Sequence, residues 1–329
     1  MHCILRTTIC LLLFAVCAGA QASAPLLLVL EKNDKDLAII DAASQKVIAR
    51  VPAGEDPHEI VADSHFAYIS NYGAFQNPQH TISVVDLVEH QALPAIDLGS
   101  LRAPHGLELV NGKVYFTAEG SKAIGRYDPA THTIDWTLGL GQNRTHMLLV
   151  DRDEKQIFTS NVNSDSISIL DRDPKADASG WTQTTISVGK GPEGFDVSPD
   201  GKQLWAANSG DGTVSVIEVA TRKVSDTFNI RTKRSNRVKF TPDGKLVLIS
   251  DLGTGDLVIL DAATHKEVKR LNLGHGIAGI LLAPDGSRAY VAVSPDSNVA
   301  VVDMKTLTVT SRISTGHGPD GMAWANSNQ

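Results

Sequence analysis

The chain has 329 residues and a formal net charge of −7, with 42 % hydrophobic and 20 % charged residues. This balance excludes a disordered or collagen-like chain, because neither has the apolar content of a packed core. An acidic chain also lacks the basic stripe that binding to duplex nucleic acid requires, so we expect no partner of that kind.

The first 22 residues have the features of an export signal. Arg6 is followed by an apolar run over residues 9–16 and by small residues over 18–20. This run is too short to span a bilayer, and no later stretch approaches the roughly 18 apolar residues that a spanning helix needs. We therefore expect a signal peptide over 1–22, a single domain over 23–329 without a transmembrane segment, and export to the periplasm or the extracellular space.

The three cysteines, Cys3, Cys10 and Cys17, all lie in this leader. The mature chain would then have no disulfide, no thiolate nucleophile and no sulfur ligand for a metal. Any chemistry has to come from histidine, carboxylate, hydroxyl or backbone groups, so the positions of these groups decide the candidate site.

An apolar alternating run that ends in an acidic residue recurs seven times along the rest of the chain. These acidic residues lie 42–47 residues apart, at Asp41, Asp86, Asp128, Asp171, Glu218, Asp261 and Asp303. Each unit carries signals for four short strands separated by turns, and none carries the amphipathic pattern of a crossover helix. Four short strands per unit of this length are typical of a propeller blade.

The phase of the repeat predicts how the ring closes. The mature chain begins on a second strand, over 26–30, and ends on a first strand, over 321–325. Seven blades form only if the two ends share one blade. We therefore expect an all-β, seven-bladed β-propeller with four antiparallel strands per blade, in which Met322 and Trp324 pair beside Leu27 and Val29. Closure of the ring hides edges that would otherwise pair with other chains.

One unit carries a recognisable repeat motif. The stretch over 191–208, with Ser-Pro-Asp-Gly at 198–201 and Trp-Ala-Ala-Asn at 205–208, resembles the YVTN-type repeat, and residues 68–71 and 158–161 fill the same tetrad. The chain thus resembles the YVTN-repeat, lactonase-like family of exported seven-bladed propellers. Such propellers include lactonases, lyases, electron-transfer subunits and binding proteins, so the function has to be argued from the site.

In a propeller the turn before each first strand lies at one mouth of the central channel. The residue at that slot is expected to face the axis in every blade. In chain order the slot residues are His58, His105, His146, Glu193, Asn236, Ala278 and Asp320. Three imidazoles and a carboxylate on four successive blades would suit a metal such as Zn, Cu, Fe or Mn, with His58, His105, His146 and Glu193 as ligands.

The same four residues have other interpretations. His105 or His146 would serve as a general base with Glu193 as its partner. Iron enzymes built on seven-bladed propellers hold an axial metal with a ring of histidines, whereas lactonase-type propellers use a similar set of His, Glu and Arg. A metal-free ligand pocket and a solvated funnel without a ligand also remain open.

Cationic residues gather in sequence near the same mouth. Three residues before the slot lie Glu55, Arg102, Asn143, Lys190, Lys233, His275 and His317, with Arg144, Arg231, Arg234 and Arg237 close by. On an acidic chain this excess would attract a small anion such as a carboxylate or a sugar acid. The residues expected to bind such a ligand are Arg102, Arg144, Arg237, Asn236, His275, His317 and Asp320.

Two further features are expected to be mainly structural. Polar residues end most second strands, at Glu31, Asn71, Asn161, Asn208 and Asp251, with Glu119 one place out of register. Asn and Asp at such positions cap the following turn. The insertion over 73–80 and the loop over 173–180 interrupt the repeat, and loops of this kind can shape a mouth.

The sequence therefore predicts a small, anionic ligand or a metal at an axial funnel lined by His58, His105, His146 and Glu193. One alternative is an enzyme that uses this ring, either a lactone hydrolase or lyase or a His-ligated metalloenzyme. A second alternative is a scaffold that holds a peptide or protein partner.

Overall fold

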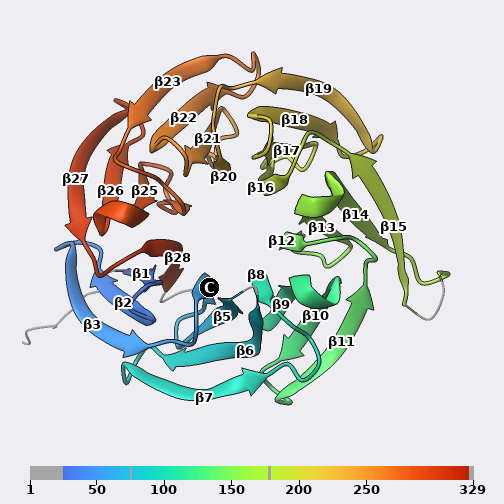
Figure 1. Cartoon of the computed structure of the whole chain (residues 1–329), viewed down its shortest axis with the longest axis horizontal. Helices are drawn as coiled ribbons and strands as arrows, with labels where there is room; N and C mark the ends of the chain where they lie inside the picture. The colour runs from blue at the N-terminus through green and yellow to red at the C-terminus, as the bar shows by residue number, and fades with distance from the viewer. Residues whose placement is uncertain (1–24, 75, 177–178, 326–329) are drawn as a thin grey trace, which may run out of the picture.

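The computed structural model describes residues 25–74, 76–176 and 179–325. These residues form seven antiparallel sheets of four strands each, arranged as blades around a central channel (Figure 1). The predicted all-β seven-bladed propeller is confirmed. The leader over 1–22 with its three cysteines lies outside the described residues, so the signal peptide and export stay predictions. Among the described residues, no helix has the length and apolar character to cross a membrane.

The blades are numbered in chain order, and the strands of each blade are named from the innermost to the outermost. Blade 1 consists of β28 (Pro319–Ala325), β1 (Leu26–Glu31), β2 (Asp36–Asp41) and β3 (Lys46–Pro52). Blade 2 consists of β4 (Pro57–Ala62), β5 (Phe66–Ala74), β6 (Asn77–Asp86) and β7 (Gln91–Asp97). Blade 3 consists of β8 (Pro104–Val110), β9 (Lys113–Ala118), β10 (Ala123–Asp128) and β11 (Thr133–Gly139). Blade 4 consists of β12 (Thr145–Val150), β13 (Gln156–Asn161), β14 (Ser166–Arg172) and β15 (Trp181–Ser187).

Blade 5 consists of β16 (Pro192–Val197), β17 (Gln203–Asn208), β18 (Thr213–Glu218) and β19 (Lys223–Asn229). Blade 6 consists of β20 (Ser235–Phe240), β21 (Leu246–Asp251), β22 (Asp256–Asp261) and β23 (Glu267–Asn272). Blade 7 consists of β24 (Ile280–Leu282), β25 (Arg288–Val293), β26 (Asn298–Asp303) and β27 (Thr308–Ser314). A 3-10 turn follows the second strand in three blades: η1 (Glu119–Ser121), η2 (Val162–Ser164) and η3 (Ser294–Asp296).

Apolar packing between neighbouring blades forms the core. The second and third strands are buried on both faces and read as continuous apolar runs, whereas an outermost strand such as β11 alternates between exposed and half-buried residues. Trp205 of blade 5 is fully buried and packs edge-on against Phe228 of its own blade and Phe240 of blade 6, with ring centroids 5.6 Å apart. Since every sheet buries both faces, each blade stabilises its two neighbours.

The acidic residues that mark the repeat end the third strands and form turns. The Asp41 carboxylate accepts hydrogen bonds from the backbone N–H and the hydroxyl of Ser44, at 2.7 and 2.6 Å. These bonds lower the pKa of Asp41 below its usual value. The same arrangement recurs at Asp303 and Thr306, so these acids hold the third and fourth strands together.

The ring closes as the sequence predicts. β28 pairs antiparallel with β1, with Trp324 opposite Leu27 and Met322 opposite Val29. The first strand of blade 1 therefore comes from the end of the described chain, and its other three strands come from the beginning (Figure 1). Ala323 lies opposite Leu28 in this pair and is buried in the core between blades 1 and 2.

Replacement of Ala323 by Arg tests the closing strand. An unpaired charge at this buried position should cost about 3–5 kcal/mol of the free energy of unfolding. Val309→Arg, on the exposed outermost strand of blade 7, is the matched control and should stay within about 0.5 kcal/mol of the unaltered protein. Urea unfolding followed by tryptophan fluorescence measures both, and equal losses in the two variants would contradict the closing role of β28.

Candidate functional site

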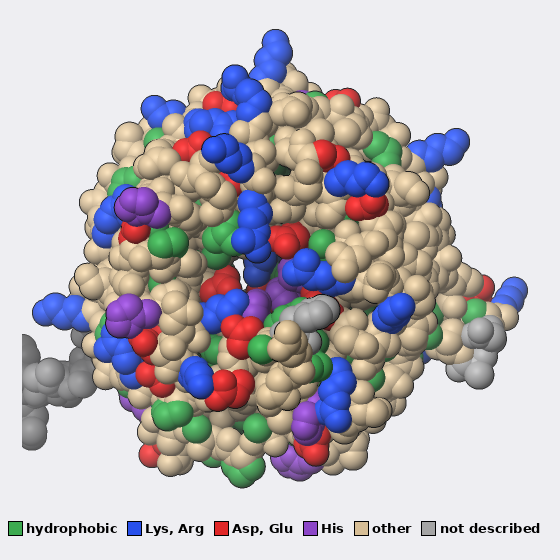
Figure 2. All heavy atoms as spheres, viewed as in Figure 1, with side chains coloured by type: hydrophobic (Ala, Val, Ile, Leu, Met, Phe, Trp, Pro, Cys, Tyr) green, Lys and Arg blue, Asp and Glu red, His purple; other side chains and the backbone are tan. Residues whose placement is uncertain are grey.

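The seven slot residues line one cavity of about 490 Å³ at a mouth of the channel: His58, His105, His146, Glu193, Asn236, Ala278 and Asp320. Six of them are the second residue of the first strand of their blade, and Ala278 lies two residues before β24, so the blade symmetry brings all seven to the axis. Figure 2 looks into this opening, where cationic, acidic and histidine side chains gather around the axis. The cavity also takes in Arg144 and Arg237, two of the cations expected to bind a ligand.

A second tier of the cavity comes from the ends of second strands in four blades. Lys32, Leu252 and Ser294 directly follow β1, β21 and β25, Tyr72 holds the equivalent position inside the longer β5, and all four line the cavity. Glu119 holds the equivalent position in blade 3, as the first residue of η1. Lys32 and Tyr72 were not predicted from the sequence, and Glu119 was expected to be a turn-capping residue.

The expected capping role is confirmed at Asp251, one place earlier, whose carboxylate accepts hydrogen bonds from the Gly253 backbone N–H and the Thr254 hydroxyl of the following turn, both at 2.8 Å. Asn71, Asn161 and Asn208 instead donate to hydroxyl groups of the third strand. In blade 3 this earlier position is Ala118, which cannot cap. The one-residue offset of Glu119 was therefore the signal in the sequence that its carboxylate had a different role.

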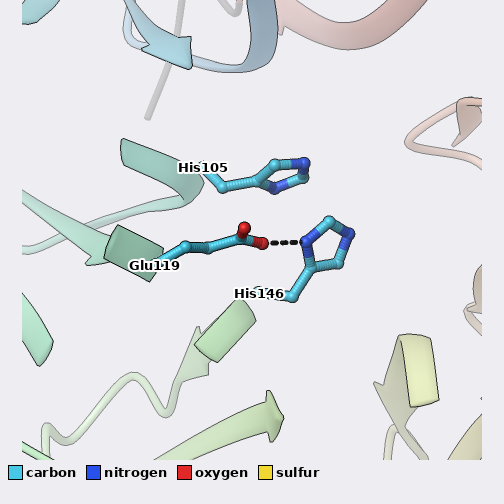
Figure 3. A group of neighbouring side chains, drawn as sticks. All are labelled: His105, Glu119 and His146. Carbon is cyan, nitrogen blue, oxygen red and sulfur yellow. Dashed lines mark hydrogen bonds and ion pairs between the residues drawn. The ribbon is translucent and has the colours of Figure 1, made fainter. Parts of the chain in front are cut away.

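Glu119 and His146 form a buried pair at the side of the cavity. The His146 Nδ1–H donates a hydrogen bond to Glu119 Oε1 (Figure 3). The Tyr72 hydroxyl donates to Glu119 Oε2 at 2.7 Å, and Arg144 Nε lies 3.5 Å from the same oxygen. Burial alone would raise the pKa of Glu119, but the hydrogen bond from His146 and the nearby Arg144 charge help to outweigh it and lower that pKa below its usual value. Glu119 is therefore a carboxylate at neutral pH.

His105 packs against this pair. Its ring centroid lies 3.8 Å from that of His146 and 4.8 Å from that of His58. Among the described residues, its buried Nδ1 has no hydrogen-bond partner. Burial, followed by repulsion from His146 and His58, lowers the pKa of His105 well below its usual value. His105 is therefore neutral at pH 7, with one ring nitrogen free.

His58 is held by a lysine at its other side. Lys32 Nζ lies 2.6 Å from His58 Nε2, and His58 Nδ1 lies 3.0 Å from the backbone oxygen of Asp56. Because an ammonium only donates, Nε2 accepts and Nδ1 carries the proton. Burial and the Lys32 charge lower the pKa of His58 below its usual value. Lys32 also lies 3.7 Å from the Asp320 carboxylate, so it joins two slot residues.

Arg237 forms the floor of the cavity. Its guanidinium makes an ion pair across the channel with Glu59 of blade 2, and its Nη1 donates to Asn236 Oδ1 at 3.1 Å. Asn236 in turn donates to Glu193 Oε2 at 3.1 Å. Arg237 and Glu59 also line a further hollow of about 330 Å³ deeper in the channel, so their ion pair separates the two spaces.

Three residues expected to bind a ligand lie elsewhere. His275 and His317 are exposed on the loops that lead to the slot, and each is bonded to an acid of a neighbouring turn, at 2.7 Å to Asp296 and 2.9 Å to Asp34. Arg102 is half-buried against Gly120 and does not line the axial cavity. All three lie three residues before the slot, and none of them lines the axial cavity.

The candidate metal ligands are brought together only in part. Among the described residues, the group whose ligand atoms all lie within 4.8 Å of one another is His105, Glu119 and His146 (Figure 3). His58 and Glu193 line the same cavity but stand outside this group. The structure therefore replaces two members of the predicted set with a carboxylate from η1.

Comparison with known proteins supports the same fold. The family model described as "Lactonase, 7-bladed beta-propeller" matches residues 130–240. The chain is a seven-bladed β-propeller that resembles this lactonase family over that third of its length. A putative 6-phosphogluconolactonase from Bacteroides fragilis is 16 % identical, with a TM-score of 0.76, over 94 % of this chain and 99 % of that chain. No curated protein matches.

Other solved structures share this lactonase-like propeller fold. Kuenenia stuttgartiensis hydrazine synthase is 20 % identical, with a TM-score of 0.73, over 85 % of this chain and 92 % of that chain. A functionally unknown protein from Desulfotomaculum acetoxidans is 10 % identical, with a TM-score of 0.76, over 92 % and 99 %. Identities this low establish the fold alone.

The lowered pKa values of His58 and His105 predict acid sensitivity of the lactonase-like propeller. Below about pH 6.5 these two histidines bind protons in the unfolded chain but stay neutral in the folded chain. The free energy of unfolding should therefore fall as the pH drops through 6.5, by at most about 1.4 kcal/mol per pH unit for each group. His105→Gln removes one such group, so urea unfolding between pH 7.5 and 5.5 should give a shallower slope.

His90→Asn is the control for this measurement. His90 is exposed, and its positive φ of 52° suits asparagine. Glu108, whose pKa burial raises to about 7, titrates in the same range with the opposite sign, so the comparison between variants isolates His105. An unchanged slope in His105→Gln would contradict the neutral state assigned to that ring.

Proposed function

We propose that the axial cavity binds a small anionic lactone and that His146, oriented by Glu119, acts as the general base in its hydrolysis. The observation that carries the proposal is the bond from His146 Nδ1 to a buried carboxylate that Tyr72 also holds, at the side of a cavity with several cations. The resemblance to lactonase-like propellers supports the reaction class.

The cations of the cavity support capture of an anion. Lys32, Arg144, Arg234 and Arg237 line it together with the acidic Glu193 and Asp320. Among the described residues, the Arg234 guanidinium makes no ion pair, and Arg144 reaches Glu119 and Glu193 only at 3.5 and 3.7 Å. Guanidinium groups with weak or absent partners are available to a carboxylate or phosphate, which they bind through two parallel hydrogen bonds.

The hydrogen bond to Glu119 sets the tautomer of His146. With the proton on Nδ1, the other nitrogen is left as a base, and Figure 3 draws it on the side of the ring away from Glu119. It would take a proton from a water molecule as the water oxygen attacks the lactone carbonyl carbon. The Glu119 carboxylate would stabilise the imidazolium that forms, as an orienting acid does in hydrolase triads.

The second half of the reaction returns this proton. Arg144 lies beside His146 and Glu119, where its charge would stabilise the oxyanion of the tetrahedral intermediate. The ring C–O bond then breaks, and the imidazolium gives its proton to the leaving alkoxide. The new carboxylic acid group releases its proton to the solvent, so the product hydroxy acid carries one negative charge more than the lactone and would also bind to the cationic lining.

His146→Gln tests the base. On lactones that carry a carboxylate or phosphate group, kcat/KM should fall by about 10²- to 10⁴-fold, since this is the usual contribution of a positioned base. Hydrolysis is followed in a pH-stat. His265→Gln is a matched control, because His265 forms a comparable pair with Asp226, at 2.6 Å, outside the axial cavity. Equal activity in His146→Gln and the unaltered protein would contradict the assignment.

A binding measurement separates capture from turnover. The product hydroxy acids should bind Lys32→Gln at least tenfold more weakly than the unaltered protein, whereas Lys202→Gln, which changes an exposed surface lysine, should bind them normally. Binding without hydrolysis would leave a ligand-binding propeller. Neither binding nor hydrolysis across the panel would reject the proposal.

A metal centre is the second candidate function. Two imidazoles and a carboxylate suit Fe, Zn, Cu or Mn, and the free Nδ1 of His105 in the described part of the chain favours it. Two contacts favour the metal-free alternative. Glu119 and His146 already bind each other, and Lys32 places an ammonium 2.6 Å from His58 Nε2, where a metal held by His58 would lie.

Metal analysis decides between the two candidates. The protein is incubated with Zn²⁺, Cu²⁺, Mn²⁺ or anaerobic Fe²⁺, dialysed, and measured by plasma mass spectrometry. We expect no stoichiometric metal and no loss of lactone hydrolysis in EDTA. One equivalent of metal that disappears in both His105→Ala and Glu119→Gln would instead establish the metal centre.

A further inference from the structure

A groove of about 490 Å³ opens beside the axial cavity, between blades 2, 3 and 4. One wall is the hairpin of β5 and β6, with Ala74 and Pro78. The other wall comes from the 3-10 turns of the next two blades, with Gly120 on η1 and Asn163 on η2. None of the axial slot residues lines this groove.

The groove adjoins the proposed catalytic pair. Tyr72 and Arg144 line both spaces, and Glu119, which binds His146, lines the groove as well. A ligand whose anionic end lies in the axial cavity and whose reacting carbonyl faces His146 would therefore extend into this groove between Tyr72 and Arg144. Among the described residues no other blade carries a comparable wall, because β5 and β6 have nine and ten residues where β13 and β17, for example, have six.

The chemistry of the walls differs from that of the axial cavity. Ala74, Pro78 and Gly120 present only carbon atoms or backbone, and the Tyr72 ring is flat and largely apolar. Asn163, Asn143 and Lys122 lie at the exposed edge, and the less exposed polar groups, Glu119 and Arg144, lie at the end beside the catalytic pair. A groove with apolar walls and a polar rim favours an uncharged hydrocarbon group, and burial of each CH₂ strengthens binding severalfold.

We infer that this groove selects substrates that carry an apolar alkyl or aryl substituent next to the anionic head. The inference rests on the proposed function, because the axial cavity must hold the anion for the substituent to reach the groove. It narrows the substrate class from small anionic lactones in general to lactones of substituted hydroxy acids.

A series of simple acids with one head group tests the groove without requiring turnover. Glycolate, 2-hydroxyhexanoate and mandelate share the 2-hydroxy acid group and carry hydrogen, n-butyl and phenyl substituents. Isothermal titration calorimetry should give a Kd for 2-hydroxyhexanoate and for mandelate at least tenfold below that for glycolate. The heat capacity change should also be more negative for the two substituted acids, because they bury apolar surface.

Asn163→Trp fills the groove from the η2 side and should bring the ratio of these Kd values close to one. Val88→Trp adds the same side chain at an exposed position away from both spaces and should keep the ratio of the unaltered protein. Equal Kd values for all three acids would contradict the inferred selectivity of the groove while leaving the proposed anion site intact. A preference that persists in Asn163→Trp would also overturn that selectivity, and no binding of any acid would reject the proposed function together with the inference.

Discussion

The pairing of β28 with β1 is the constraint on which the rest of the structure depends. It joins the two ends of the described chain and forces seven sheets to share one axis. Contacts that define the site connect different blades: Arg237 and Glu59 are 178 residues apart, and Glu119 and His146 are 27 apart. Without closure of the ring, none of these distances would be set by the fold.

Apolar packing between the blades stabilises the fold, whereas the polar channel holds the candidate functional site. Packing between blades supplies the stability, and it does so around the whole ring. The channel instead holds buried ionisable groups, which are costly unless they pair. Glu119 is paired with His146, Glu59 with Arg237, and Lys32 with His58. Such a concentration of perturbed groups in one cavity is typical of a functional site rather than of a structural core.

Much of the site could be predicted because residues at the same position of the repeat occupy equivalent places in every blade. The slot residues were assigned to the axis from spacing alone, and they line one cavity. Side-chain direction within the loops could not be predicted in this way. His275 and His317 are three residues from the slot, yet local turn geometry points them outward to Asp296 and Asp34. Glu119 holds a position whose equivalents Lys32, Tyr72 and Leu252 line the cavity in other blades, but these residue types differ from blade to blade and gave no repeated signal.

The sequence by itself determined the seven-fold repeat, the strand order in each blade, the register of the closing strand and the ring of axial residues. It could do so because apolar alternation and turn residues are local signals that repeat with the blade. Which groups touch was decided only by the tertiary structure: that His146 binds Glu119 and not Glu193, that Lys32 binds His58, and that a groove opens beside Tyr72. These contacts depend on the distance and angle between neighbouring sheets, which close packing of the whole ring sets and no single repeat encodes.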